Sequence, residues 1–201
     1  MKQAIAHLKQ ADPILAAIIT RVGPLKPRYA PPTFENLVRS IAYQQLNGKA
    51  AATIFQRLAD ACGGAIDPAA LEKLSDADLR RVGMSKQKSS YLRDLAHKTN
   101  TGEIDFARLP ELPDEEVITQ LTKIKGVGTW TAQMFLMFAL RRPNVMPTGD
   151  FGINLAIRKA YRMRKMPKPK RVLQISKKWQ PYCSLACYYL WRSIDGDKKQ
   201  D

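Results

Sequence analysis

Apolar side chains recur every three or four positions along most of the chain, which is the spacing that places them on one face of an α-helix. The segment from residue 34 is an example, and its apolar face comprises Phe34, Leu37, Val38, Ile41 and Ala42. No segment alternates apolar and polar residues as a β-strand does, and no Asn-Gly turn joins two such segments. The pattern therefore predicts an all-α fold.

Turn and capping residues set the ends of the expected helices. Asp12-Pro13 should break the first helix in two, because proline lacks the N–H donor that a helix needs. Gly48 should interrupt the helical pattern before it resumes. Side chains suited to N-capping stand at Thr33, Asp67, Ser75 and Ser85. The expected helices span residues 3–20, 34–46, 49–62, 67–74, 75–83, 86–98, 115–123, 129–140 and 150–162, with a last one within 170–192.

The chain carries a large excess of positive charge. Its 201 residues include 33 Lys and Arg against 18 Asp and Glu, a formal net charge of +15. Such an excess favours a polyanionic partner, of which nucleic acid is the commonest, although a basic protein without such a partner is the alternative. With 45% hydrophobic residues the chain can also bury a core, as one domain or as two small lobes.

Other sequence signals point to a reducing compartment and away from membranes. The first residues contain no long apolar core or cleavage site, so we expect no signal peptide, and no apolar run approaches the roughly 20 residues that span a bilayer. The three cysteines, Cys62, Cys183 and Cys187, cannot form a closed set of disulfides. Cys183 and Cys187 have the spacing to share one edge of a metal site, but no further ligands lie nearby, so we expect buried thiols and no metal.

A glycine-rich turn, Lys125-Gly126-Val127-Gly128, lies between two predicted helices. Its glycines let the backbone approach a ligand closely, and the N–H groups at the start of the next helix, from Thr129, attract anions. With Lys123 and Lys125 beside it, the turn is suited to hold a phosphodiester group without reading base sequence. An ordinary connection between two helices is the alternative, since glycine is common where helices end.

Asp150 follows Gly128 by 22 residues and immediately precedes another predicted helix. An aspartate in that place is typical of an N-cap. A catalytic role is compatible with the cap, because hydrogen bonds from helix N–H groups keep the carboxylate ionised. Such a group is suited to stabilise a developing cation.

Several motifs, taken together, resemble one known family. They are Leu121-x-x-Ile124-Lys125-Gly126-Val127-Gly128-x-Trp130-Thr131-Ala132, Pro147-x-x-Asp150, Ile41-Ala42-x-Gln44-Gln45, Gly83-Met84-Ser85-x-x-Lys88-x-x-Tyr91-Leu92-x-x-Leu95-Ala96 and Trp179-x-Pro181-Tyr182-x-Ser184-x-Ala186. Over roughly residues 10–192 they resemble the helix-hairpin-helix (HhH-GPD) DNA glycosylase superfamily and, within it, the 3-methyladenine DNA glycosylase II branch.

The resemblance implies two helical lobes with a DNA-binding cleft between them, together forming a single module over residues 1–201. Residues of about 34–146, with the hairpin at 121–132, would form one lobe, and residues 1–33 plus 147–201 the other. It also implies excision of alkylated purines, of the 3-methyladenine and 7-methylguanine type, after the base is flipped out. Strand-cleaving members carry a lysine two residues after the second glycine, where this chain has Trp130, so no lyase activity is expected. Iron–sulfur members carry four closely spaced cysteines that this chain lacks near its C-terminus, so we expect no cofactor.

The same resemblance assigns roles to individual residues. Asp150 would stabilise an oxocarbenium-like sugar and orient the attacking water. A cationic base would stack on Trp130 with Tyr43 or Trp191, although core packing is the interpretation we favour for Trp191. Gln45 or Leu46 would fill the gap that the flipped base leaves, with core packing the alternative for Leu46. The full base pocket is Trp130, Tyr43, Gln44 and Trp191, and the DNA contacts are Lys125, Gly126, Val127, Gly128, Thr129, Gln45 and Leu46.

A basic run follows the Asp150 helix, and three interpretations stay open for it: a solvated loop, a targeting patch, or a DNA-backbone contact. Its members are Arg158, Lys159, Arg162, Arg164, Lys165, Lys168, Lys170 and Arg171. We expect a monomer that acts on double-stranded DNA containing alkylated bases, in the cytoplasm with the nucleoid if bacterial or in the nucleus if eukaryotic. The rivals are a glycosylase for a deaminated, oxidised or mismatched base and a non-catalytic helix-hairpin-helix DNA-binding module.

Overall fold

Helices make up all the regular secondary structure in residues 1–195, the part of the chain that the computed structural model describes. The predicted all-α fold is therefore confirmed. Contacts within the chain divide it into two compact units. Unit 1 combines the two chain ends, Met1–Tyr29 and Arg141–Asp201, and unit 2 is the continuous segment Ala30–Leu140.

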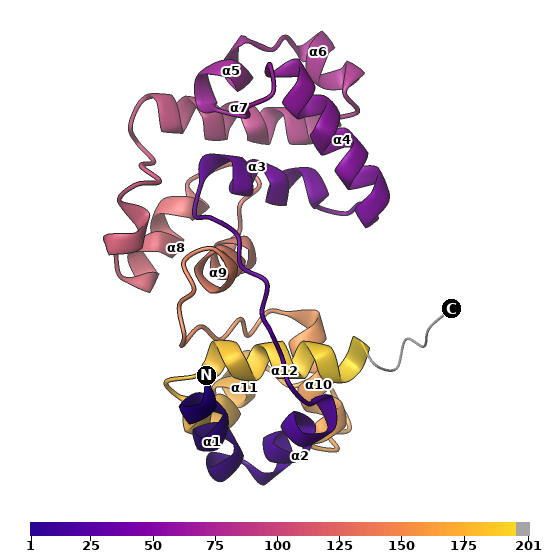
Figure 1. The fold of residues 1–201 in the computed structure, drawn as a ribbon, viewed down its shortest axis with the longest axis vertical. Helices are drawn as coiled ribbons and strands as arrows, with labels where there is room; N and C mark the ends of the chain where they lie inside the picture. Colours follow the sequence, from indigo (N-terminus) through magenta and orange to yellow (C-terminus); the bar gives the residue numbers. More distant parts are fainter. Residues whose placement is uncertain (196–201) are drawn as a thin grey trace. The chain divides into compact units, whose positions relative to one another are not determined.

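Unit 2 is built around the helix α7, which packs against α3, α5 and α6, while α8 and α9 pack against each other (Figure 1). Its core is aliphatic near α3 and α7, and aromatic where Phe106 meets both Phe34 and Phe135 edge to face, with ring centroids 6.1 Å apart in each of the two pairs. The helices are α3 (Phe34–Tyr43), α4 (Gly48–Ala61), α5 (Pro68–Lys73), α6 (Asp76–Arg81), α7 (Lys86–Asn100), α8 (Asp114–Thr122) and α9 (Thr129–Phe138), with a 3-10 turn η1 (Leu109–Glu111).

Unit 1 is built around its last helix, α12, against which α2 and α10 pack, and α1 packs on α2 (Figure 1). Its elements are α1 (Lys2–Ala11), α2 (Pro13–Val22), α10 (Phe151–Ala160), α11 (Pro169–Ser176), the 3-10 turn η2 (Lys177–Trp179) and α12 (Cys183–Asp195). The N-terminal and C-terminal segments of the chain thus share one core.

A fully buried carboxylate, that of Asp12, joins those two ends of the chain. Its Oδ1 caps α2 by accepting the N–H groups of Ile14 and Leu15, at 3.0 and 3.3 Å. Its Oδ2 accepts hydrogen bonds from the Tyr161 hydroxyl and, at 2.8 Å, from Trp179 Nε1, and Lys178 Nζ lies 3.2 Å away. Burial by itself raises the pKa of Asp12, but these partners outweigh it and the pKa lies below its ordinary value.

Most of the predicted helix starts are confirmed by side-chain caps. Thr33, Asp67 and Ser85 accept backbone N–H groups at the starts of α3, α5 and α7. Ser75 and Asp78 form a complete capping box at α6. The expected break at Asp12-Pro13 separates α1 from α2. Local side chain-to-backbone bonds of this kind depend only on near neighbours, so the sequence alone specifies them.

Three predicted boundaries are wrong. The helix that starts at residue 34 ends at Tyr43 instead of Leu46, because Gln44 and Gln45 form a turn. Gly48 does not interrupt a helix but is the first residue of α4, since Asn47 accepts the N–H of Ala50 and acts as the N-cap. The region 170–192 holds two helices, α11 and α12. They are separate because Pro181 has no N–H to donate and holds Gln180 in an extended conformation.

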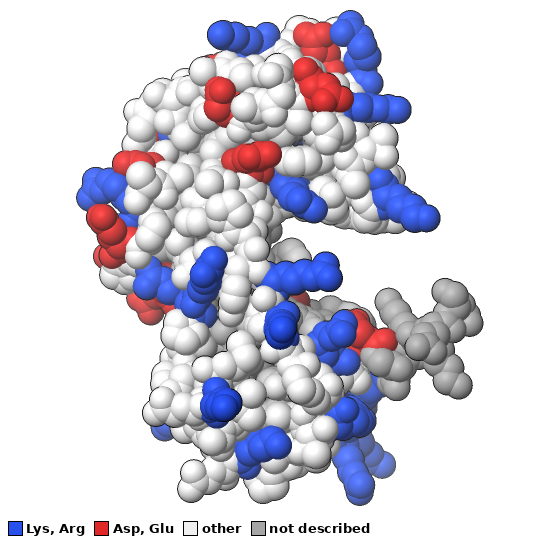
Figure 2. Space-filling model, in the orientation of Figure 1, with Lys and Arg blue, Asp and Glu red and all other residues white. Residues whose placement is uncertain are grey.

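The two units differ sharply in charge. Unit 2 contains 13 Lys and Arg and 13 Asp and Glu, whereas unit 1 contains 20 Lys and Arg and 5 Asp and Glu, so unit 1 carries the whole net charge of +15. Figure 2 shows the same contrast on one face, where basic side chains cover unit 1 and acidic ones gather on unit 2. Among residues 1–195, none of the helices combines the length and the apolar character that crossing a bilayer requires.

Candidate functional site

Asp150 is the N-cap of α10 and is almost wholly buried, with 6% of its surface exposed. Its Oδ1 accepts the N–H of Ile153 at 2.7 Å, and its own N–H donates to the carbonyl of Pro147 at 3.0 Å. The carboxylate is therefore fixed both through its side chain and through its backbone. The predicted cap is confirmed, and the cap leaves the carboxylate in a defined orientation.

A second donor reaches the same oxygen from α12. Trp191 Nε1 donates to Asp150 Oδ1 at 2.9 Å, and the Trp191 ring lies 6.1 Å from that of Tyr188, centroid to centroid. Gly152 allows this approach, because a Cβ there would lie 3.0 Å from Trp191 Cδ1 and 3.3 Å from Asp150 Oδ1. The interpretation of Trp191 as plain core packing is wrong, since it is only partly buried and its indole donates a hydrogen bond to the carboxylate.

One face of α12 supports the segment that leads to Asp150. Ser184 Oγ donates to the carbonyl of Arg142 at 2.6 Å and accepts the N–H of Val145 at 3.0 Å. Cys187 Sγ lies 3.9 Å from the carbonyl of Val145. Ser184, Cys187 and Trp191 are three and four residues apart, so they share one helix face. The Ser184 motif of the sequence thus acts by placing the Asp150 segment on α12.

The cysteines of α12 are buried thiols, as predicted. Burial raises the pKa of Cys183 to about 11, and burial and then the nearby Cys183 and Asp150 raise that of Cys187 further. No group of three or more His, Cys, Asp or Glu side chains within residues 1–195 has the arrangement of a metal site.

Phe151 is a site residue that the sequence did not single out. It follows Asp150 directly, begins α10 and is 71% exposed, the most exposed of the large hydrophobic side chains in residues 1–195. A single exposed apolar side chain is ordinary on a folded surface, so the interest of Phe151 lies in its place next to the fixed carboxylate of Asp150. The sequence signal for it is an apolar residue in the first turn of a predicted helix that does not lie on the apolar face of that helix.

The glycine turn has the geometry of a helix-hairpin-helix motif between α8 and α9. Gly126 has φ of +77°, a left-handed conformation that favours glycine, and Gly128 is the N-cap of α9 without a side-chain cap. The N–H groups of Gly126, Gly128 and Thr129 donate to no acceptor within residues 1–195. Three exposed donors at the positive end of a helix are suited to bind an anion.

Two members of the predicted DNA-contact set support the turn from within. Val127 is 4% exposed and its N–H donates to the carbonyl of Ile124 at 3.0 Å. The N–H of Lys125 donates to Asp94 Oδ2 at 2.8 Å, while its side chain reaches solvent. The exposed donors therefore come from the glycines and Thr129, and the lysine contributes charge.

The turn after α3 lies against the hairpin. Gln44 Nε2 donates to the carbonyl of Gly126 at 3.1 Å, so two segments 82 residues apart are joined. Gln45 has φ of +57°, and both Gln45 and Leu46 are exposed, Leu46 by 41%. Core packing of Leu46 is therefore excluded. An exposed apolar side chain on a constrained turn is suited to act as a wedge.

The two remaining residues of the predicted base pocket lie in unit 2 in different surroundings. Trp130, on the first turn of α9, is 48% exposed. Tyr43 is half-buried, with the Arg39 guanidinium 5.0 Å from its ring centroid and the Phe55 ring 6.5 Å away. The tyrosine thus already has a cation over one face, and about half of the surface of the tryptophan is exposed.

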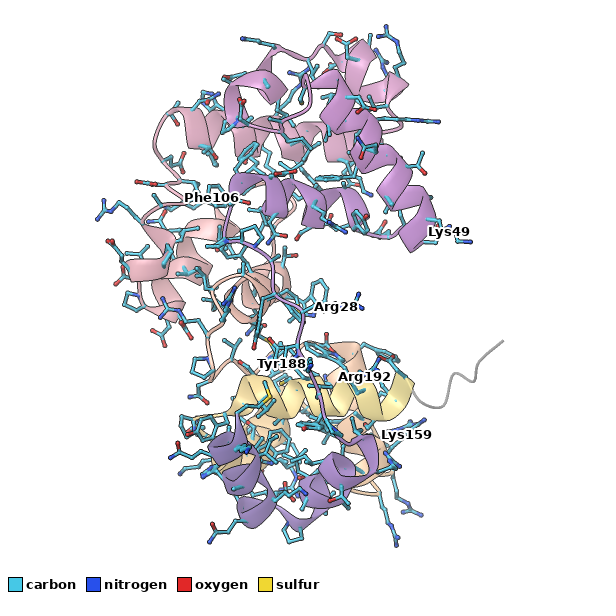
Figure 3. The ribbon with its side chains drawn as sticks, viewed as in Figure 1. Arg28, Lys49, Phe106, Lys159, Tyr188 and Arg192 are labelled. Atoms are coloured by element: carbon cyan, nitrogen blue, oxygen red, sulfur yellow. The ribbon has the colours of Figure 1, made fainter. Side chains whose placement is uncertain are left out.

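The basic run begins in α10 and continues through α11. Lys159 projects from α10 and Arg192 from α12 (Figure 3). Arg158 is half-buried, and the members from Arg162 to Arg171 are exposed. This run and the Asp150 carboxylate belong to the same strongly basic unit, so the surroundings of the carboxylate attract polyanions.

Comparison with known proteins matches these features to one family. The model of the "HhH-GPD superfamily base excision DNA repair protein" matches residues 38–181. DNA-3-methyladenine glycosylase 1 of Schizosaccharomyces pombe is 34% identical over 96% of this chain and 87% of its own length. The YfjP protein of Bacillus subtilis is 36% identical over 79% of this chain, which spans only 58% of that relative. A solved structure of the S. pombe 3-methyladenine DNA glycosylase in complex with abasic DNA superposes with a TM-score of 0.85 at 32% identity, covering 98% of this chain and all of that one.

Proposed function

Because the chain belongs to the HhH-GPD superfamily of base excision DNA repair proteins, we propose that it is a monofunctional DNA glycosylase that releases alkylated purines from double-stranded DNA. The observation that carries the proposal is the carboxylate of Asp150, buried, capped by Ile153 N–H and oriented by Trp191. The relatives named as 3-methyladenine DNA glycosylases support the choice of substrate.

The chemistry follows from where the positive charge develops. Alkylation at N3 or N7 gives the purine a positive charge and weakens its bond to the sugar. As that bond breaks, charge passes to the sugar ring, which becomes oxocarbenium-like. A fixed, ionised carboxylate stabilises that cation more than it stabilises the neutral sugar, which is the condition for catalysis. Asp150 would supply this stabilisation and orient the water that attacks the sugar carbon.

Trp130 is our choice for the aromatic surface that accepts the flipped base. Its ring is 48% exposed, and a flat cation over an indole gains about 0.5–2 kcal/mol. Tyr43 is a weaker choice, because the Arg39 guanidinium already lies 5.0 Å from its ring centroid and would repel a second cation. We assign Gln44 and Trp191 to positioning, through their bonds to Gly126 and to Asp150.

DNA would be held by groups that do not read base sequence. The N–H groups of Gly126, Gly128 and Thr129 would bind a phosphate of one strand, and Lys125 would add charge beside them. Gln45 or Leu46 would enter the space that the flipped base vacates. We further propose that the protein acts as a monomer, since one catalytic carboxylate and one hairpin suffice for this reaction.

Base release from methylated duplex DNA by the wild type and by Asp150→Asn tests the proposal. We expect the wild type to release 3-methyladenine and 7-methylguanine, and the variant to lose nearly all release while still binding DNA. Asparagine caps helices as well as aspartate does, so α10 should persist. Asp67→Asn is the matched control, because Asp67 is also an N-cap aspartate, accepting Ala70 N–H at 2.8 Å in unit 2, and its replacement should leave release intact.

Each result separates the proposal from its rivals. Release that is equal in the wild type and Asp150→Asn would remove Asp150 from the mechanism. DNA binding with no release of any base would favour a non-catalytic DNA-binding module. Release of only deaminated or oxidised bases would reassign the substrate.

The absence of a lysine at position 130 predicts that base excision occurs without strand cleavage. A bifunctional glycosylase forms a Schiff base between a lysine and the sugar, which borohydride reduces to a stable adduct. We expect no adduct between this protein and DNA under borohydride. A trapped adduct would show that another amine of the chain performs lyase chemistry.

A further inference from the structure

Helix α7 carries a stripe of polar side chains that the proposed chemistry does not use. Lys88, Tyr91, Asp94 and Lys98 are three or four residues apart and therefore follow one face of the helix. Lys88 and Tyr91 belong to the Gly83–Ala96 motif of the sequence. Each of the first three side chains reaches a backbone segment outside α7.

Lys88 reaches the end of α3. Its Nζ donates to the carbonyl of Ala42 at 2.8 Å and to the carbonyl of Gln44 at 2.7 Å. These carbonyls lie at the C-terminus of α3, where the helix dipole is negative and a cation is favoured. Partial burial lowers the pKa of Lys88, in agreement with an ammonium group that these carbonyls draw away from solvent.

The two bonds fix the backbone immediately before the exposed tip of the turn. Gln45, the next residue, has φ of +57°. A left-handed conformation in a residue other than glycine persists only where its surroundings impose it. Lys88, by fixing the carbonyls of Ala42 and Gln44, supplies that constraint for Gln45 and Leu46.

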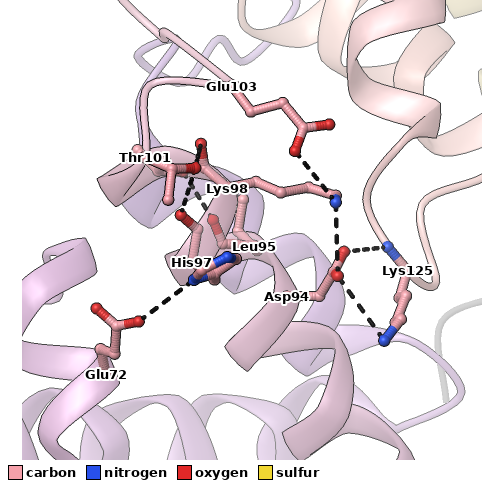
Figure 4. Close-up of polar contacts among 9 residues, drawn as sticks. Glu72, Asp94, Leu95, His97, Lys98, Thr101, Glu103 and Lys125 are labelled. Atoms are coloured by element: carbon pink, nitrogen blue, oxygen red, sulfur yellow. Dashed lines mark hydrogen bonds and ion pairs between the residues drawn. The ribbon is translucent and has the colours of Figure 1, made fainter.

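Tyr91 and Asp94 reach the hairpin. The Tyr91 ring lies flat on Gly126, where a Cβ would be 2.1 Å from its Cδ2, so no side chain fits at position 126. Asp94 Oδ2 accepts the N–H of Lys125 at 2.8 Å, and Asp94 Oδ1 lies 3.9 Å from Lys125 Nζ and 3.7 Å from Lys98 Nζ (Figure 4). The hairpin thus rests on α7 through both packing and charge.

Both exposed turns of unit 2 are therefore attached to the same helix, and Gln44 joins them directly through its bond to Gly126. We infer that α7 holds the wedge turn (Gln44–Asn47) and the hairpin turn (Lys123–Gly128) at a fixed separation, and that Lys88 is the positioning residue for the wedge turn during base flipping. The inference rests on the proposed glycosylase function and deepens it, since it assigns a role to a residue that touches neither base nor sugar.

The energetic demand of flipping explains why a fixed wedge matters. Extruding a base costs its stacking and pairing, and the cost is smallest when the base is unpaired. A wedge turn that is already in place offsets this cost without losing conformational freedom at that moment. A mobile turn would lose that freedom during flipping, so the rate of base release should fall most where the target base is firmly paired.

Single-turnover release of 7-methylguanine by Lys88→Met tests the inference on two duplexes. One has the lesion opposite cytosine, and the other has it opposite an abasic-site analogue, which removes the pairing cost. We expect the variant to be at least about tenfold slower on the paired duplex, the loss that a slightly misplaced group brings. On the unpaired duplex the variant and the wild type should differ by no more than about twofold.

Two further variants show whether the effect passes through the wedge. Lys86→Met removes a lysine from the same helix whose side chain makes no hydrogen bond or ion pair within residues 1–195, so it should keep wild-type rates on both duplexes. In a Leu46→Ala background, Lys88→Met should cause little additional loss. Equal slowing on both duplexes, or unchanged rates on both, would overturn the inference.

Hydrogen exchange separates failure of this inference from failure of the proposed function. If Lys88 restrains the wedge turn, amides of residues 43–47 should exchange faster in Lys88→Met than in the wild type, while those of α9 stay unchanged. This readout needs no activity, so it holds even for a wild type that releases no base. Unchanged exchange at residues 43–47 would refute the positioning role of Lys88.

Discussion

Replacement of Gly152 by alanine is the sharpest probe of how Asp150 is held. The added Cβ would lie 3.0 Å from Trp191 Cδ1 and 3.3 Å from both Trp191 Nε1 and Asp150 Oδ1. Carbon atoms in good contact lie about 3.5–4.0 Å apart, so the indole must withdraw by about half an ångström. Its 2.9 Å bond to the carboxylate would then lengthen to about 3.4 Å and weaken.

The magnitude follows from that displacement. A hydrogen bond to a charged group contributes about 1.5–3 kcal/mol, so weakening the bond from Trp191 removes part of the restraint on the carboxylate, while the Ile153 N–H still donates to it at 2.7 Å. Misplacing a catalytic group by about 1 Å can cost 10²-fold in rate, so a shift of about half that size should cost about tenfold. Stability should not fall in parallel, because alanine favours a helix over glycine by up to about 1 kcal/mol.

The assay is single-turnover release of 7-methylguanine with saturating enzyme, with thermal unfolding measured on the same preparations. Gly149→Ala is the matched control, since a Cβ there meets no atom within 4 Å. It should change the rate by no more than about twofold, as is usual for open surface positions. A wild-type rate in Gly152→Ala would refute the argument that close packing of Trp191 positions Asp150, and an equal fall in Gly149→Ala would show a general effect on the loop.

Two other predictions concern unit 1. Asp12→Asn should keep the cap on α2, but the amide N–H groups of asparagine would then oppose the donors of Trp179 and Tyr161, which need an acceptor. The free energy of unfolding at pH 7 should fall by about 3–5 kcal/mol. The pKa of Asp12 is lowered on folding, so the stabilisation by its carboxylate is present above the unfolded value near 3.8 and is lost as the pH falls through the folded value. The free energies of unfolding of the wild type and the variant, measured in urea, should therefore converge below pH 3.8. A difference that stays constant with pH would contradict this. The double variant Lys165→Ala, Lys168→Ala should reduce the slope of log affinity against log salt concentration by about 0.9 for each DNA phosphate that the protein no longer neutralises. Lys73→Ala, in the neutral unit 2, is the control and should leave the slope unchanged. An unaltered slope in the double variant would show that the basic run does not contact DNA.

Local rules account for the features that the sequence predicted correctly. The caps at Thr33, Asp67, Ser75 and Ser85 each involve the neighbour three residues away. The hairpin glycines and Asp150 at the start of α10 were likewise visible, because a left-handed turn and an N-cap each require particular residue types at particular positions. The errors were local as well, as at Gly48, where the capping capacity of Asn47 was overlooked.

The spacing of apolar and polar residues did not predict contacts between segments that are distant in the sequence. Trp191 was predicted as a member of the base pocket, with core packing as the favoured interpretation, and only the packing of α12 on α10 brings its indole to Asp150, 41 residues away. The same holds for Lys88 and the turn 44 residues before it, and for Gln44 and Gly126, which are 82 residues apart. Periodicity gives the face on which a side chain lies, but not the partner across from it.

The sequence by itself thus determined most of the helices, the family and the place of the Asp150 carboxylate at the start of a helix, since each of these depends on short-range spacing and residue type. The tertiary structure decided what orients that carboxylate, which N–H groups of the hairpin stay available, and that unit 1 carries all of the net charge. These properties arise when segments far apart in the chain pack together, because hydrogen bonds and charge act over distances in space and not along the sequence.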